Sequence, residues 1–280
     1  MKNSTSSWLF VAFSSLMFVS VGYMLLDRQG LLWGFALAVG IHSSIYFYSD
    51  MRILRLFKGR VLEGQDPWGI IYNTKKLAQR AKIPVPKVYI IKSLSPQAFS
   101  VGRNLHVSRI VLTEGVLKHF DEEEIKAIIA YQIATIKNND TLAFTTSGVL
   151  VGLLLSFTSN LDRAYRWLFV IRRKDLGIKS YLFTWLLSPV ISVLLKIHVH
   201  SKNYFEIDKL AAELLQNPEV LARVIWKLES FKSTMPFKVP ISMSHMLMTS
   251  AFQPKGWLKH FIIHPPQSKR IKKLVGYFPI

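Results

Sequence analysis

The sequence predicts a mostly helical α+β protein that is integral to a membrane. Hydrophobic residues make up 50% of the 280 residues, and the mean hydropathy of +0.24 is high for a soluble protein. Four long stretches carry almost no charge, whereas segments of strand-like composition are short and fall within residues 88–112. The chain contains no cysteine, which excludes disulfides and thiolate metal sites.

Residues 1–50 are predicted to form a transmembrane hairpin. Residues 8–26 are uncharged, and their number matches the roughly 20 residues that cross a bilayer as a helix. A cleaved signal peptide is the alternative, but the apolar run is long and no small-residue cleavage site follows it. After a short loop, residues 31–48 form the second span, so both ends lie on one side. A basic cluster follows and places that side in the cytoplasm. Its members are Arg52, Arg55, Lys58 and Arg60.

Residues 51–140 are predicted to form the first part of a soluble domain. Trp68–Ala81 has the apolar periodicity of an amphipathic helix. Three short segments between proline and glycine turn signals predict a small antiparallel sheet, which a short helix at Thr113–His119 follows. The three segments are Val88–Ile91, Ala98–Gly102 and His106–Leu112.

The next helix has a recognisable start. Asp121 is suited to cap it, and Glu124 stands three residues later, as in a capping box. Apolar residues at helical spacing continue to about Lys137, and residues 138–140 break the helix. We therefore expect one helix from Glu122 to Lys137.

Residues 141–200 are predicted to hold two further membrane-associated helices, at 141–158 and 181–199. Their connector is rich in arginine and lysine, so if both helices cross fully, this basic loop lies outside, against the positive-inside rule. The alternative is a shallow pair, with Trp167–Ile171 as an interfacial segment. Residues 201–280 form the second part of the soluble domain. It contains helices at Asn203–Gln216 and Pro218–Phe231 and a methionine-rich loop at Ser233–Gln253.

The formal net charge of +19 suits an anionic partner. Anionic lipid and nucleic acid are both compatible with this charge. No nucleic-acid-binding module accompanies it, so we expect membrane lipid as the partner and no nucleic acid.

Four motifs in the order of the chain resemble those of the HtpX-like family of membrane zinc metallopeptidases. Gln97–Gly102 is similar to the family's N-A-F-x-x-G strand, and Glu122–Asp140 to the helix that carries H-E-x-x-H. Tyr204–Asp208 is similar to the E-x-x-x-D helix, and His264–Ile271 to H-P-P-x-x-x-R-I. The resemblance covers most of the chain. It implies a gluzincin-like metallopeptidase domain in a bacterial inner membrane, facing the cytoplasm.

The sequence departs from this family at the positions that carry the chemistry. The resemblance assigns the zinc ligands to Tyr131, Thr135 and Tyr204, where the family has two histidines and a glutamate, and the general base to Gln132. A threonine hydroxyl and a neutral phenol are poor zinc ligands, and a glutamine cannot take a proton from water. We therefore expect no zinc, no cofactor and no catalytic residue.

The four substituted positions are compatible with two interpretations. They form a repacked cluster with satisfied hydrogen bonds, or they form a pocket that holds a ligand. The other histidines offer no replacement metal site, because His198 and His200 do not share a helix face. Five residues remain as candidates for binding or structural roles: Phe99, Gly102, Asp140, Asp208 and His264.

The sequence thus predicts a catalytically inactive relative that binds membrane-protein or peptide segments, or an active protease or quality-control partner. Strand addition at the sheet edge near Phe99–Arg103 needs only backbone groups, so peptide capture survives loss of the metal. One alternative is an active zinc endopeptidase with non-standard ligands. Another is a basic protein that binds lipid or nucleic acid at the membrane surface.

Overall fold

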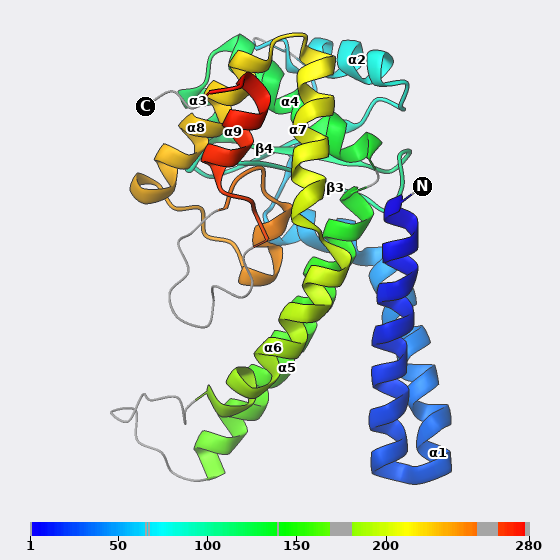
Figure 1. The fold of residues 1–280 in the computed structure, drawn as a ribbon. Coiled ribbons are helices and arrows are strands. Elements are labelled where there is room, and N and C mark those ends of the chain that lie inside the picture. The colour runs from blue at the N-terminus through cyan, green and yellow to red at the C-terminus, as the bar shows by residue number, and fades with distance from the viewer. Residues whose placement is uncertain are drawn as a thin grey trace.

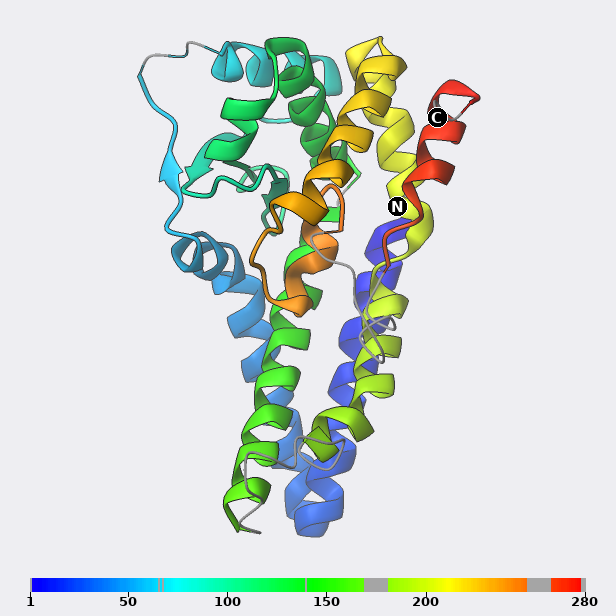
Figure 2. The ribbon, with the colours of Figure 1, turned by 90° about the vertical axis from the view of Figure 1, so that its left-hand side faces the viewer.

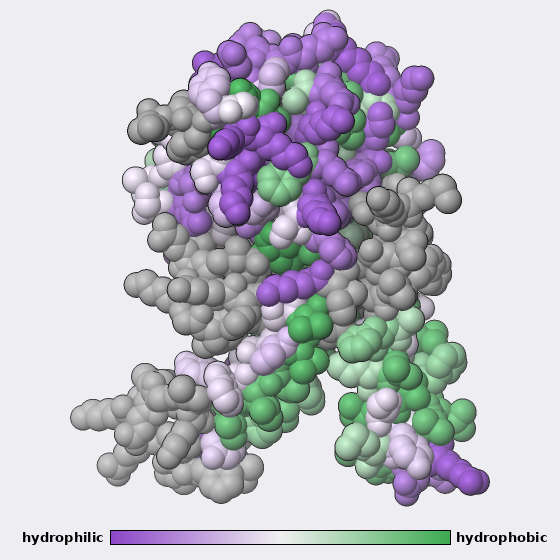
Figure 3. Space-filling view, viewed as in Figure 1, coloured by the Kyte–Doolittle hydropathy of each residue, from purple (hydrophilic) through white to green (hydrophobic). Residues whose placement is uncertain are grey.

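The computed structural model describes residues 2–64, 66, 68–138, 140–168, 181–250 and 263–277. A head built from a small sheet and several helices carries two pairs of long helices, which project from it in the same direction (Figures 1 and 2). Among the visible described residues, hydrophobic ones gather on the helix pairs and hydrophilic ones cover the head (Figure 3). The fold class predicted from the sequence is confirmed.

The first pair is a hairpin formed by α1 (Lys2–Leu56), whose two halves meet at a kink at Leu26 and Asp27. Its two helices touch through glycines: a Cβ on Gly22 would lie 2.2 Å from the carbonyl oxygen of Gly30. Small residues allow such close approach of membrane helices. The His42 ring and the Ser14 hydroxyl form a hydrogen bond of 3.2 Å between the helices. This contact holds the hairpin together.

Replacement of Gly34 by leucine is expected to force the hairpin open. A Cβ at Gly34 would lie 2.6 Å from the backbone oxygen of Phe18, and backbone atoms cannot move aside cheaply. Because the chain has no cysteine of its own, spin labels attach only at the introduced Leu16→Cys and Ser43→Cys. In Gly34→Leu, the distance between the two labels is expected to become longer and more broadly distributed. Gly40→Leu is the control, because a Cβ there meets no described atom within 4 Å. An unchanged distance in Gly34→Leu would contradict the packing.

The second pair consists of α5 (Asp140–Leu168) and α6 (Leu182–His198), which lie side by side. The helix α5 is longer than the predicted 141–158, and residues 140–167 are long and apolar enough to cross a membrane. Buried Asp162 accepts hydrogen bonds from the backbone N–H groups of Phe183 and Thr184, at 2.8 and 3.2 Å. This carboxylate caps the start of α6. Most of the predicted interfacial segment, 167–171, lies outside the described residues.

The sheet has four strands in the order β1-β2-β4-β3. They are β1 (Arg60–Val61), β2 (Lys87–Ile91), β3 (Ala98–Val101) and β4 (Arg109–Thr113). The prediction of an antiparallel sheet is wrong in one pairing, because β2 and β4 run parallel, with Val88 opposite Ile110. The last strand begins at Arg109 rather than at His106, because Asn104 binds the amides of His106 and Val107 in a turn. In this strand order, β3 lies at an edge of the sheet.

Three helices follow or flank the sheet: α2 (Ile70–Ala81), α3 (Glu114–His119) and α4 (Glu122–Lys137). The predicted capping box is confirmed: Asp121 accepts from the Glu124 amide at 2.8 Å, and Glu124 accepts from the Asp121 amide at 3.1 Å. Glu124 also pairs with Lys227 at 2.6 Å, which ties α4 to the later helix α8. The helix α4 is buried almost throughout and forms the centre of the head.

The end of the chain completes the head with α7 (Ser201–Leu215), α8 (Pro218–Thr234) and α9 (Gln267–Val275). The methionine-rich stretch, predicted as a loop, contains the short 3-10 helix η2 (Ile241–Met246). The helix α9 was not expected from the sequence. It begins directly after His264-Pro-Pro and packs against α7 and α8.

Candidate functional site

The four positions of the expected catalytic site lie in the middle of the head, on α4 and the first turn of α7. Tyr131, Gln132, Thr135 and Tyr204 are 3%, 1%, 2% and 0% exposed. The two tyrosine rings meet at the guanidinium of Arg270, whose Cζ atom lies 5.4 Å from one ring centroid and 5.9 Å from the other. The structure thus brings Tyr131 and Tyr204 together around a buried cation.

Tyr204, at the expected third-ligand position, is bonded within the protein. Its hydroxyl donates a hydrogen bond to the backbone oxygen of His245, at 2.7 Å. Its ring stacks on Phe144 at 5.8 Å and lies 4.6 Å from the ring of His264. Burial raises the pKa of Tyr204 well above its ordinary value, so its hydroxyl is a neutral phenol. Tyr204 therefore acts here as a hydrogen-bond donor.

The three positions on α4 are satisfied only in part. The Thr135 hydroxyl turns back onto its own helix and donates to the backbone oxygen of Tyr131, at 2.9 Å. Within the described part of the chain, the Tyr131 hydroxyl and the Gln132 Nε2 atom have no hydrogen-bond partner. Buried polar atoms normally have a protein or water partner. The interpretation as a repacked cluster therefore fits Thr135 and Tyr204. The Tyr131 hydroxyl and the Gln132 Nε2 atom are the places where a water or a small polar ligand would bond.

The zinc that this fold family implies does not fit these residues. Burial also raises the pKa of Tyr131, with Arg270 opposing the rise, so both tyrosines are neutral phenols. Zinc sites use imidazole, thiolate or carboxylate donors, and the four positions offer two phenols, a hydroxyl and an amide. Among the described residues, no group of three histidine, aspartate or glutamate side chains gathers closely enough to hold a metal ion.

Asp208 forms a buried ion pair with Arg270, and sequence reasoning missed this arginine as a site residue. Arg270 Nε and Nη2 donate to the two carboxylate oxygens at 2.8 and 2.6 Å, and both side chains are nearly inaccessible. Burial lowers the pKa of Arg270, but the charge and hydrogen bonds of Asp208 and the nearby tyrosines together outweigh burial and hold this pKa above its ordinary value. Arg270 belongs to the His264–Ile271 motif, and this position was the sequence signal that could have identified it as a site residue. The pair joins α7 to α9.

Asp140, at the start of α5, joins three elements. Its carboxylate accepts hydrogen bonds from the side-chain amides of Asn138 and Asn203, both at 2.7 Å. It is fully buried. These bonds tie the end of α4 and the beginning of α5 to α7, so this candidate residue holds the helices of the site in place.

The sheet edge at Phe99 is covered by another part of the same chain. Leu247 forms an antiparallel bridge with Phe99, and the Met248 amide donates to the backbone oxygen of Ala98 at 3.2 Å. We call residues 245–248 the covering segment. Further along, the Gly102 amide donates to the Thr145 hydroxyl at 3.4 Å. A peptide that adds to this edge at Ala98 and Phe99 has to displace the covering segment first.

Three side chains of the site hold the backbone of the covering segment. Tyr204 binds the oxygen of His245, His264 Nε2 donates to the oxygen of Leu247 at 2.9 Å, and Arg270 Nη1 donates to the oxygen of Met248 at 2.8 Å. His245 is itself buried, and its ring Nε2 lies 2.9 Å from the backbone oxygen of Phe144, to which it donates a hydrogen bond. The end of η2 and the two residues after it therefore lie against the side chains of the expected catalytic site.

His264 is expected to make the protein less stable in acid. Burial lowers the pKa of His264 to about 3, from 6.5 in an unfolded chain. Between these values the unfolded state binds the proton and the folded state does not, so stability falls as the pH falls. The fall is at most about 1.4 kcal/mol for each pH unit. Urea unfolding at pH 7 and 5 measures it.

In His264→Gln, the side-chain amide replaces the imidazole as hydrogen-bond donor but does not take up a proton in this pH range. The variant is therefore expected to show a smaller change of unfolding free energy with pH. His106→Gln is the control, because His106 is exposed. Equal pH dependence in the wild type and in His264→Gln would contradict the assignment.

The comparisons with known proteins agree with the architecture. Residues 70–277 match peptidase family M48. The chain is 27% identical to a "Protease HtpX homolog" of Desulfatibacillum aliphaticivorans, over 100% of this chain and 91% of that protein. It is 28% identical to the homolog of Pyrococcus furiosus, over 95% and 93%.

The chain also shares its fold with a solved structure. The crystal structure of S. mikatae Ste24p matches with a TM-score of 0.53 and 16% identity, over 98% of this chain and 65% of that one. The chain thus spans slightly less than two thirds of that protein, and at this identity the likeness concerns the fold alone.

Proposed function

This chain belongs to peptidase family M48, and we propose that it is a catalytically inactive, HtpX-like membrane protein that acts by binding. The observation that carries the proposal is the chemistry of the former site. All three ligand positions and the base position hold residues that neither bind zinc well nor accept a proton from water. Loss of a single catalytic group usually costs orders of magnitude in rate, so loss of all four leaves no hydrolysis.

The bonding around the site supports the same proposal. Tyr204 and Arg270 both donate hydrogen bonds to backbone oxygens of the covering segment, so these side chains hold another part of the same chain. A hydrolytic site keeps an open metal position for the reacting water. The closed arrangement favours a structural use of these residues over an active peptidase with non-standard ligands.

The partner in this proposal is a segment of a membrane protein, or an active protease of a quality-control assembly. The covered sheet edge disfavours simple addition of a peptide strand. The apolar helix pairs offer the remaining surface: Leu32, Trp33 and Phe35 of the hairpin are 74%, 66% and 61% exposed. The basic cluster after the hairpin supports an inner-membrane location with the head in the cytoplasm.

Metal content and proteolysis test the proposal. The detergent-purified protein is expected to contain much less than one zinc per chain by mass spectrometry, and to leave casein uncut with or without chelator. A relative with an intact H-E-x-x-H motif, purified in the same way, is the positive control. Stoichiometric zinc together with chelator-sensitive cleavage would instead establish an active enzyme with non-standard ligands.

A further inference from the structure

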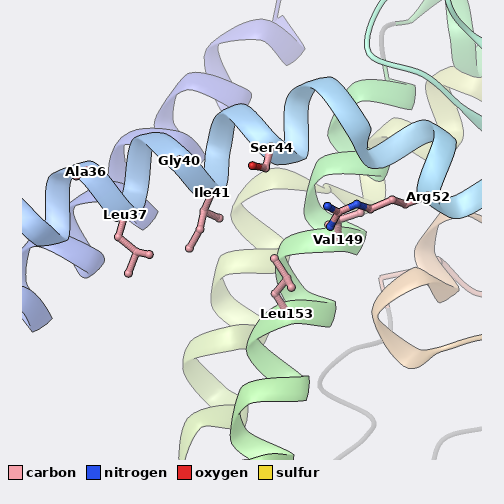
Figure 4. A pocket seen from close by; sticks show the side chains of 8 residues that line it. All are labelled: Ala36, Leu37, Gly40, Ile41, Ser44, Arg52, Val149 and Leu153. Carbon is pink, nitrogen blue, oxygen red and sulfur yellow. The ribbon is translucent and has the colours of Figure 1, made fainter.

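A groove runs between the second helix of the hairpin and α5 (Figure 4). One part of it is a cavity of about 410 Å³, whose walls carry Leu37, Gly40 and Ile41 from the hairpin and Val149 and Leu153 from α5. A second cavity of about 460 Å³ shares Arg52, Val149 and Leu153 with the first, so the two are continuous. The lining is largely apolar.

Gly40 keeps this groove open. A Cβ on Gly40 would meet no described atom within 4 Å, so the space beside it is free. Next to the groove, buried Leu150 of α5 packs against Met17 and Ile41 of the hairpin. The groove is therefore a gap between packed helices, and a larger side chain at residue 40 would fill it without moving the backbone.

Arg52 stands where the two cavities meet, at the end of the first cavity, with its side chain directed toward Val149 (Figure 4). Within the described part of the chain, Arg52 forms no ion pair and no hydrogen bond. An arginine without a counter-ion beside an apolar groove suits a ligand with an anionic head and an apolar tail.

The groove has the height of one leaflet of a bilayer. Arg52 lies 25 residues after the kink at Asp27, which is about 37 Å along a helix, more than the roughly 30 Å hydrocarbon core. The kink and Arg52 therefore reach opposite interfaces. Leu37 lies about 22 Å from Arg52, near the middle of the membrane. The first cavity therefore extends from the headgroup level at Arg52 to the depth where an acyl chain ends, at Leu37.

We propose that this groove binds one anionic phospholipid, with the phosphate at Arg52 and one acyl chain along Leu37, Ile41 and Leu153. The volume argues against a transmembrane helix as the occupant. A helix about 10 Å wide and 30 Å long fills on the order of 2,000 Å³, far more than the two cavities provide. This site goes beyond the proposed function and does not depend on whether the chain hydrolyses peptides.

Native mass spectrometry tests the site, with phosphatidylglycerol and phosphatidylcholine added to the delipidated protein in detergent. The wild type is expected to retain one phosphatidylglycerol and to prefer it to phosphatidylcholine by about fivefold, the contribution of one arginine near a charged headgroup. Gly40→Phe is expected to abolish this retained lipid. Arg52→Gln is expected to keep the lipid but lose the preference.

Two controls separate the groove from general lipid contact. Val39→Phe adds the same ring at a neighbouring position that is 49% exposed and does not line the cavities. Arg28→Gln removes an exposed charge at the far end of the hairpin. Both are expected to behave as the wild type. The spin-label distance across the hairpin verifies that Gly40→Phe is folded.

Two results would overturn the proposal. Full retention of the lipid by a folded Gly40→Phe would show that the lipid binds elsewhere. An equal loss of preference in Arg28→Gln and Arg52→Gln would show attraction by overall charge.

Discussion

Replacement of Asp208 by alanine is expected to lower the free energy of unfolding by about 3–5 kcal/mol, the usual cost of leaving one buried charge of a pair alone. Arg270 would keep its bond to the Met248 oxygen but lose both bonds to the carboxylate. Since Asp208 joins α7 to α9, the loss affects the second half of the head. Chemical unfolding in detergent, followed by circular dichroism, measures the change.

Two variants control this experiment. Glu213→Ala removes an exposed carboxylate of the same helix, 3.9 Å from Lys209, and is expected to cost less than about 0.5 kcal/mol. Asp208→Leu combined with Arg270→Met removes both charges and is expected to recover part of the loss, because no buried charge then remains. A loss below about 1 kcal/mol in Asp208→Ala would contradict a buried pair.

Replacement of Thr135 alone by histidine is expected to restore neither zinc binding nor proteolysis. Thr135→His adds one imidazole to a site whose other two ligand positions are phenols, and a catalytic zinc needs three protein ligands and a water. The variant is therefore expected to hold no stoichiometric zinc and to leave casein uncut. Zinc-dependent cleavage by this single variant would contradict the assignment of the lost groups.

The fourfold change Tyr131→His, Gln132→Glu, Thr135→His and Tyr204→Glu is expected to bind about one zinc per chain. The same variant with Gln132 retained is its matched control. It is expected to bind zinc but to cut casein far more slowly, by roughly 10²–10⁴-fold if the fourfold variant cuts it, because the general base is missing. Failure of both variants to bind zinc would mean that the helices no longer hold the ligand geometry of the family.

Local signals in the sequence were sufficient for much of the fold. The capping box at Asp121 and Glu124 depends on residues three positions apart, so it could be predicted and is confirmed. The hairpin depends on the length and charge of two stretches, and the structure contains it. The helix α9 lacks a side-chain cap, which explains why its start was missed.

Pairings over long sequence distances could not be predicted in the same way. The parallel pairing of β2 with β4 depends on a crossover that places β3 at the edge, and no residue in the strands signals it. The partner of Asp208 lies 62 residues away on α9. The motif around Asp208 marked it as a candidate for a structural role but did not identify Arg270 as its partner.

The sequence predicted which residues form the site, but not which part of the chain lies against them. Sequence motifs identified Tyr131, Gln132, Thr135 and Tyr204 as the positions of the expected catalytic site, and these residues lie on α4 and α7. They did not reveal that the covering segment lies across the sheet edge, because its bonds are made by backbone atoms, which every residue type provides. The predicted peptide capture near Phe99 stays a prediction that now requires displacement.

The covering segment also protects copies of this protein from one another. An exposed edge strand presents unpaired backbone groups to any neighbouring chain, and it is a common starting point for aggregation. The β3 edge is sealed from within the chain, at Ala98 by the Met248 amide and at Phe99 by Leu247. Copies that lie close together in one membrane therefore meet with this part of the sheet edge already paired. The three side chains that hold the covering segment thus also favour solubility of the head.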